Sequence, residues 1–383
     1  MDVETNRAEL EAWLILLRTP GFGPAALRER IGRCGSAAAA LAEARRAGST
    51  SADARDWLRA PRREAIDADL AWLAEPGHTL LRFDEDDFPA LLGAMPSPPA
   101  ALFAVGRVEA LWLPQVAVVG SRSASHAGLA TASAFARALT GAGFAITSGL
   151  AEGIDGAAHA AALDAGGATI AVLGTGPDRV YPRRHRELAA RIEAGGALVS
   201  EFAPGTPARP AHFPRRNRII AGLALGTLVV EAGLCSGSLI TAREAADAGR
   251  DVFAVPGSIR NPLARGCHQL IRSGARLVED AAELVAELAP AARNLGLRLR
   301  ERLAGDAPAG ASDQAGDALA CDPDRTKVLT ALGTDELGVD ELAQRTGLPV
   351  PALSAALLML ELDGAVVATG GGAYARREDR ARR

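Results

Sequence analysis

An arginine-rich segment with aromatic residues is the part of this chain best suited to bind phosphates. Between Arg179 and Arg218 there are nine arginines and three glutamates, although the whole chain carries a formal net charge of -4. Tyr181 and Phe213 lie within this segment beside several of the arginines. Guanidinium groups pair with phosphates and aromatic rings stack on bases, so the composition favours single-stranded nucleic acid. A solvated surface that meets an acidic protein partner explains the charge equally well.

Loops rich in glycine and serine form a second group of candidates. Each follows an apolar run and precedes a helical stretch, where glycine permits a tight turn and hydroxyl or amide groups can hold a phosphate. Arg122 adds a charge with bidentate geometry, which a simple helix cap would not need. The GxGxxG dinucleotide fingerprint is absent. The candidate phosphate contacts in these loops are Gly120, Ser121, Arg122, Ser148, Gly149, Ser236, Gly237 and Ser238.

Patterns for catalysis or metal binding are missing from the sequence. It has no GxSxG elbow, no P-loop and no CxxC pair. Asp155 and His159 are four residues apart, but no third ligand has fitting spacing, so we expect Asp155 to cap a helix. Glu231 is either a general acid or base, or a carboxylate that caps a neighbouring helix. We therefore predict no catalytic residue, no metal and no cofactor.

The elements that position these loops alternate between strand and helix. Short runs rich in Val, Ile and Leu are separated by Ala-rich helical stretches such as 127–142, 156–165 and 239–248. This alternation predicts an extended Rossmann-like α/β fold with a doubly wound, mostly parallel sheet, whose ligands bind beyond the carboxyl ends of the strands. The predicted strands are 78–83, 101–105, 116–119, 144–147, 169–173, 197–200, 227–230, 252–255 and 275–278.

Charge is distributed unevenly over the predicted domains. Residues 115–280 hold 17 basic and 13 acidic side chains, whereas both flanks are acidic, so a phosphate-bearing partner would meet the middle. We expect five parts: a helical, SAM-like domain (1–75), the Rossmann-like domain (76–289), a linker (290–324), a winged-helix domain (325–375) and a basic tail (376–383) that is a solvated segment.

Two features of the flanks could also touch DNA. The turn at 20–24 precedes a short helix with Arg28 and Arg30, as in a helix-hairpin-helix, although a purely structural helical module explains it better. The third helix of the predicted winged helix, 351–363, has two acids and no Arg or Lys. A recognition helix needs base-reading and phosphate-binding groups, so we expect this domain to contact protein.

The chain is expected to work in the cytoplasm. It has no apolar run of about 18 residues, so no membrane span is predicted. Its acidic N-terminus lacks the signal-peptide pattern, and its four dispersed cysteines suit a reducing compartment.

In their order along the chain, these loops resemble the DNA-processing protein A family, also called DprA or Smf. The resemblance covers roughly residues 80–280. The matching motifs are Val118-Val119-Gly120-Ser121-Arg122, Ser148-Gly149-Leu150-Ala151-Glu152-Gly153-Ile154-Asp155, Tyr181-Pro182, Phe213-Pro214-Arg215-Arg216-Asn217-Arg218-Ile219-Ile220-Ala221-Gly222, Val230-Glu231-Ala232, Ser236-Gly237-Ser238-Leu239-Ile240-Thr241-Ala242 and Ala254-Val255-Pro256-Gly257.

The resemblance implies a non-catalytic protein that binds single-stranded DNA, forms a homodimer and loads the recombinase RecA during natural transformation. By motif, Gly120, Ser121 and Arg122 would hold a phosphate. Phe213 would lie against a base or sugar. Residues 250–280 would supply dimer and RecA contacts. The positive groove would be formed by Arg183, Arg216, Asn217 and Arg218.

Two other functions remain open from the sequence. One is an enzyme that acts on free nucleotides, like the related phosphoribohydrolases, with Glu231 as its carboxylate, although their Pro-Gly-Gly-x-Gly-Thr-x-x-Glu pattern is absent. The other is a sequence-specific regulator acting through the winged helix, which the uncharged third helix disfavours.

Overall fold

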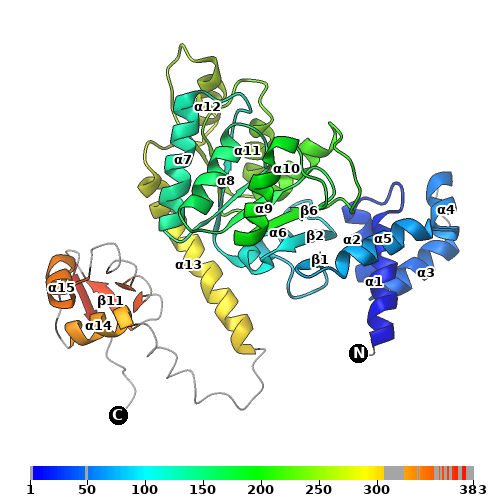
Figure 1. Ribbon diagram of the computed structural model, residues 1–383, viewed down its shortest axis with the longest axis horizontal. Coiled ribbons are helices and arrows are strands. Elements are labelled where there is room, and N and C mark those ends of the chain that lie inside the picture. Colours follow the sequence, from blue (N-terminus) through cyan, green and yellow to red (C-terminus); the bar gives the residue numbers. More distant parts are fainter. Residues whose placement is uncertain are drawn as a thin grey trace. The chain divides into compact units, whose positions relative to one another are not determined.

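The computed structural model divides the protein into two compact units (Figure 1). It describes residues 3–47, 51–305 and, apart from short gaps between 334 and 372, residues 323–376. The first unit ends at Gly296 and the second begins at Leu297. Each unit has its own apolar core, and the predicted site lies wholly within the first.

A nine-stranded sheet forms the centre of the first unit. Its strand order is β1-β2-β6-β5-β4-β3-β7-β8-β9. The seven strands β3 to β9 run parallel to one another, and β1 and β2 add an antiparallel edge next to β6. This confirms the predicted fold class. The strands are His78–Arg82 (β1), Ala101–Gly106 (β2), Gln115–Val119 (β3), Ala145–Ser148 (β4), Thr169–Val172 (β5), Ala197–Ser200 (β6), Gly226–Val229 (β7), Asp251–Ala254 (β8) and Arg276–Leu277 (β9).

Helices cover both faces of this sheet, as buried parallel strands require. Along β3, Val116 and Val118 face one apolar cluster with α7 and α8, whereas Ala117 and Val119 face another with α10. The helices of this part are Ala90–Gly93 (α6), His126–Gly141 (α7), Ile154–Asp164 (α8), Arg186–Gly195 (α9), His212–Leu223 (α10), Ser238–Asp247 (α11), Arg265–Arg272 (α12) and Ala281–Gly305 (α13), with 3-10 turns at Val108–Trp112, Arg183–His185 and Pro262–Ala264.

The helical N-terminal segment packs directly against the sheet. Its residues share one apolar cluster with Phe103 of β2 and Leu198 of β6. Arg18 pairs with the buried Asp69 at 2.6 Å and also donates to the carbonyl of Pro204, in the loop before α10. The helices are Val3–Leu17 (α1), Pro24–Cys34 (α2), Ala37–Ala47 (α3), Ala52–Arg59 (α4) and Arg63–Leu73 (α5).

The turn at 20–24 joins α1 to α2 as expected, but the arginines of α2 are engaged within the protein. Arg28 donates to the carbonyl of Pro99 and lies 4.4 Å from the ring centroid of Phe83, and Arg30 pairs with Glu43. These contacts support the structural interpretation of this turn.

One boundary of the predicted linker needs correction. Residues 290–305, assigned to the linker from composition, continue helix α13 without a break at Pro290. Residues 306–322 lie outside the described residues.

The second unit contains the helices and the small sheet of a winged helix. They are Pro323–Leu332 (α14), Leu337–Gly338 (β10), Val339–Thr346 (α15), Val366–Thr369 (β11) and Ala373–Arg376 (β12), with strand order β10-β12-β11. Part of the predicted third helix, and the basic tail after Arg376, lie outside the described residues. Within the described residues, no helix is long and apolar enough to cross a membrane.

Candidate nucleic-acid interface

A cavity opens where the sheet reverses its winding direction. β4, β5 and β6 follow β3 on one side, and β7, β8 and β9 continue on the other. The loops after β3 and β7 therefore separate, and the space between them is the usual ligand position of a doubly wound sheet. The cavity has a volume of about 660 Å³, and Arg122, Phe213, Arg216, Asn217 and the loop 236–238 contribute to its lining.

An aromatic pair and a cation stand together at this cavity. The rings of Phe213 and Tyr181 have centroids 5.4 Å apart, and the Arg122 guanidinium lies 5.5 Å from the Phe213 ring. Tyr181 is 49% exposed, whereas Phe213 is half-buried. These three side chains also line a smaller pocket that continues past Pro182. The group offers stacking surface beside a positive charge.

Arg122 is free to bind an anion. Its side chain is exposed, and no carboxylate among the described residues forms an ion pair with it. The preceding turn is tight: a Cβ at Gly120 would lie 2.6 Å from Ile154 and 2.8 Å from the Glu231 carbonyl. The amide of Ser121 donates to that carbonyl at 2.6 Å, so the turn holds Arg122 at the mouth of the crevice.

The start of α7, expected to attract a phosphate, already holds a carboxylate of the protein. Glu231 accepts hydrogen bonds from the Ser125 amide at 2.8 Å and the Ser125 hydroxyl at 2.6 Å. The same hydroxyl accepts from the Gly128 amide. Of the two roles left open for Glu231, the structure therefore supports helix capping.

Replacing Glu231 by glutamine should destabilise the first unit. The neutral amide offers one acceptor where the carboxylate offers two, so we expect a loss of about 1–2 kcal/mol in the free energy of unfolding. Urea unfolding followed by circular dichroism measures this. The exposed Glu187→Gln serves as control, and equal stability of both variants would contradict the capping role.

Arg216 lies in the floor of the cavity and is 4% exposed. It donates to the carbonyls of Gly149, at 2.6 Å, and Val172. Burial lowers the pKa of its guanidinium to about 10, although nearby Asp155 opposes this shift. Arg216 therefore lines the cavity as a desolvated, internally bonded cation.

Two of the predicted contacts have other roles in the structure. Ser148 is buried, and its hydroxyl donates to the Val118 carbonyl at 2.6 Å. Arg218 is 7% exposed, pairs with Glu201 and donates to the Ser97 carbonyl at 2.6 Å. Neither side chain lines the cavity. This corrects the expected site, because both side chains are buried and bonded to other parts of the protein.

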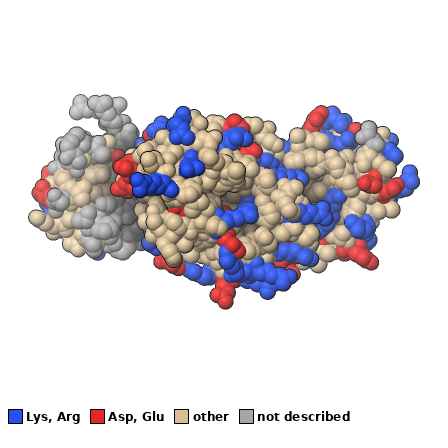
Figure 2. All heavy atoms as spheres, turned by 90° about the horizontal axis from the view of Figure 1, so that it is seen from above, with Lys and Arg blue, Asp and Glu red and all other residues tan. Residues whose placement is uncertain are grey.

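Much of the arginine excess is neutralised by acids that the local count did not include. Arg184 pairs with Glu152, and Arg191 pairs with Asp164 at 2.5 Å. Figure 2 shows basic side chains in several separate groups, some beside acidic ones, rather than in one continuous band. Arg183 is exposed and forms no ion pair with the described carboxylates, but it does not line the cavity.

Asp155 and His159 do not form a metal site. Asp155 accepts from the amides of Gly149 and Ala151, at 3.1 and 3.3 Å, so it stabilises the loop before α8 rather than capping the helix at its first residue. Among the described residues, no group of three His, Cys, Asp or Glu side chains is placed to hold a metal ion.

His159 is fully buried, and burial lowers its pKa to about 3. Its Nδ1 lies 2.7 Å from the Thr169 hydroxyl, which itself donates to the Ile146 carbonyl, so Nδ1–H is the donor. Nε2 has no partner among the described residues. The folded protein thus keeps this imidazole neutral in mildly acidic solution.

Acidification should consequently destabilise the first unit through His159. In the unfolded chain His159 binds a proton below about pH 6.5, whereas in the folded chain it stays neutral down to about pH 3. The free energy of unfolding therefore decreases as the pH falls across this range. At about pH 5 the loss is about 2 kcal/mol. His159→Asn should remove this dependence in urea unfolding, whereas the exposed His126→Asn should retain it. An unchanged pH dependence in His159→Asn would contradict the assignment.

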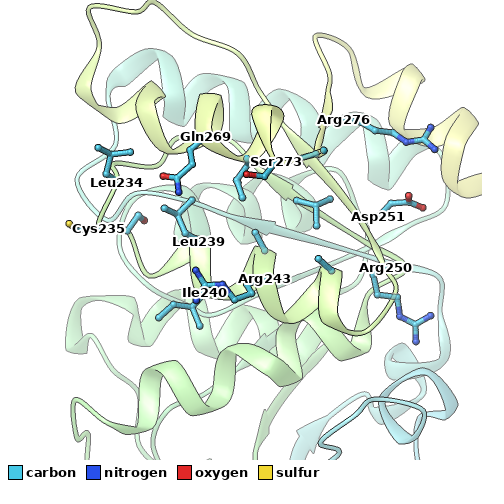
Figure 3. A pocket seen from close by; sticks show the side chains of 17 residues that line it. Leu234, Cys235, Leu239, Ile240, Arg243, Arg250, Asp251, Gln269, Ser273 and Arg276 are labelled. Atoms are coloured by element: carbon cyan, nitrogen blue, oxygen red, sulfur yellow. The ribbon is translucent and has the colours of Figure 1, made fainter.

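The start of α11 forms the other side of the cavity. Ser236 and Ser238 have hydroxyls 2.8 Å apart, and Gly237 is exposed between them. Past this turn, a separate groove of about 590 Å³ runs between α11 and α12, where Gln269 points toward Leu239 (Figure 3). Of the predicted DNA contacts, only Ser236 lines this groove, so it is distinct from the candidate site.

Tyr181 belongs to the cavity although it was not among the predicted site residues. The sequence indicated it only as a ring beside the arginines and as part of a Tyr-Pro motif. Its exposed ring lies closer to solvent than that of Phe213, and an aromatic residue next to a predicted stacking residue in space cannot be found without the fold.

Fold and site together define a Rossmann-like α/β protein with a ligand crevice at its topological switch point and a winged-helix unit. The family model described as DNA recombination-mediator protein A matches residues 79–289, and the DprA winged helix domain matches residues 307–372. The chain belongs to the DNA recombination-mediator protein A family, also called DprA or Smf. This confirms the resemblance seen in its motifs.

Relatives and solved structures agree with this assignment. Protein Smf of Escherichia coli (strain K12) is 44% identical over 85% of this chain and 84% of its own length. The X-ray structure of DNA processing protein A from Streptococcus pneumoniae has a TM-score of 0.65 at 36% identity, covering 72% of this chain and 97% of that one. A Helicobacter pylori structure, reported with its single-stranded DNA binding mode, has a TM-score of 0.51 at 26% identity, covering 56% and 96%.

Proposed function

We propose that this chain is a non-catalytic protein that binds single-stranded DNA in the crevice between the loops that follow β3 and β7. The observation that carries the proposal is Arg122, which forms no ion pair with a described carboxylate and lies beside the rings of Phe213 and Tyr181. A single strand exposes both its phosphates and its base faces, so it can use the cation and the rings together. The relative from Helicobacter pylori, described as binding single-stranded DNA, supports this choice.

The proposed contact set follows from the lining of the cavity. Gly120, Ser121 and Arg122 would bind one phosphate, and the turn from Ser236 to Ser238 would bind another. Phe213, with Tyr181 beside it, would stack on a base. Arg183 would contact the DNA strand outside the cavity.

We further propose the family's wider role for this chain. It would act in the cytoplasm as a homodimer and load RecA onto incoming single strands, with residues 250–280 near the dimer and RecA contacts. In an assay of RecA nucleotide hydrolysis on DNA coated with single-strand-binding protein, the chain should shorten the lag. An unchanged lag would contradict the loading role.

The alternative is hydrolysis of a nucleoside monophosphate with Glu231 as the catalytic carboxylate. Its carboxylate is buried and bonded to Ser125, and it does not line the cavity. We therefore expect no release of adenine from AMP. Release that is lost in Glu231→Gln would favour the enzyme over the binding protein.

Competition binding tests the proposed function. A fluorescent oligo-dT bound to the full chain should be displaced by unlabelled single strands of unrelated sequence, because stacking does not read sequence. Duplex of the same length should displace it at least tenfold less well. Equal displacement by duplex would overturn the proposal.

A further inference from the structure

A chain of hydrogen bonds runs across the floor of the crevice. Arg216 donates through Nη1 to the carbonyl of Gly149, in the loop after β4, and through Nε to Asn217 Oδ1 at 3.1 Å. The Nδ2 of Asn217 donates to the carbonyl of Gly237 at 3.2 Å, at the start of α11. Two neighbouring residues of α10 thus link loops on opposite sides of the topological switch point.

The loop on the β4 side is held from both directions. Arg216 binds the Gly149 carbonyl, while Asp155 accepts from the amides of Gly149 and Ala151. A Cβ at Gly149 would overlap the Arg216 guanidinium, so a larger residue here would displace that guanidinium. The guanidinium also lies 6.0 Å from the centroid of the Phe213 ring. The same side chain therefore also lies next to the stacking ring.

These contacts make Arg216 a poor phosphate ligand. It is almost fully buried, and its Nε and Nη1 are used inside the protein. Nη2 is its only donor without a partner among the described residues. A direct contact through Nη2 is the rival role, and it predicts a different salt dependence because each phosphate contact releases counterions.

We propose that Arg216 and Asn217 are positioning residues, which hold the two sides of the crevice at a fixed separation without binding phosphate themselves. This inference rests on the proposed single-stranded DNA site. In this proposal, Arg216 in the basic motif of α10 holds the loops together through hydrogen bonds, and Arg122 binds the phosphate.

Two measurements on the full chain test this inference. Arg216→Met should weaken oligo-dT binding tenfold or more at fixed salt, while the slope of log K against log salt stays at the wild-type value. In the free protein, hydrogen exchange should become faster for amides at 149–152 and 236–239. Asn217→Ala should likewise weaken oligo-dT binding and make exchange at these amides faster, because it breaks the link to Gly237.

Arg218→Met is the matched control, because Arg218 is also buried on α10 but binds Glu201 and Ser97 instead. It should leave both affinity and local exchange near wild type. A slope reduced by about 0.7 in Arg216→Met would show a direct phosphate contact and overturn the inference. Wild-type affinity, or faster exchange spread over the whole first unit, would also overturn it. If the wild-type chain fails to bind oligo-dT, the proposed function fails and this inference falls with it.

Discussion

Replacing Arg122 by alanine is expected to weaken oligo-dT binding about tenfold or more. A hydrogen bond to a charged group contributes about 1.5–3 kcal/mol, and no carboxylate among the described residues pairs with Arg122 to compete for it. Removing one phosphate contact should also reduce the slope of log K against log salt by about 0.7. Fluorescence anisotropy titrations at several salt concentrations measure both quantities.

The control for this variant is Arg191→Ala. Arg191 belongs to the same arginine-rich segment when the sequence alone is considered, but it pairs with Asp164 and does not line the cavity. It should bind oligo-dT like the wild type. An equal loss in both variants would mean that general positive charge, and not the crevice, holds the DNA.

Replacing Phe213 by leucine should weaken binding by a different route. Stacking of a base on an aromatic ring contributes about 1–3 kcal/mol, whereas leucine keeps the packing against Gly174 and loses the flat π face. The affinity should therefore fall between about fivefold and about 140-fold, with an unchanged salt slope. The same titrations measure this.

Tyr181→Leu is the companion variant, since its ring is the more exposed of the pair. We expect Tyr181→Leu to weaken oligo-dT binding less than Phe213→Leu does, again with an unchanged salt slope. Wild-type affinity in both variants would show that neither ring stacks on the ligand.

Most of the sheet could be predicted because its strands are buried on both faces. Runs of Val, Ile and Leu such as 116–119 and 197–200 cannot place their side chains in water, and each coincides with a strand to within one residue. The linker was predicted to begin at residue 290 because residues 290–324 are rich in Ala, Pro, Gly and Asp, but this position lies inside helix α13. The helix-forming residues after Pro290 continue it to Gly305.

The site could be predicted only in part, because charge and burial depend on contacts between distant segments. The loops 120–122 and 236–238 were placed correctly at the cavity, since the carboxyl ends of parallel strands share one edge. The burial of Arg216 and the pairing of Arg218 with Glu201 depend on how α10 packs, which no local pattern contains. The contact between the rings of Tyr181 and Phe213 depends on the fold for the same reason.

Cross-linking of oligo-dT to the full chain tests the central claim most directly. Ultraviolet irradiation joins stacked bases to nearby aromatic residues, and peptide mapping locates the bond. The account predicts cross-links on peptides that contain Tyr181 or Phe213, suppressed by excess single strand and retained in excess duplex. Cross-links confined to residues 323–376, or suppressed equally by duplex, would contradict it.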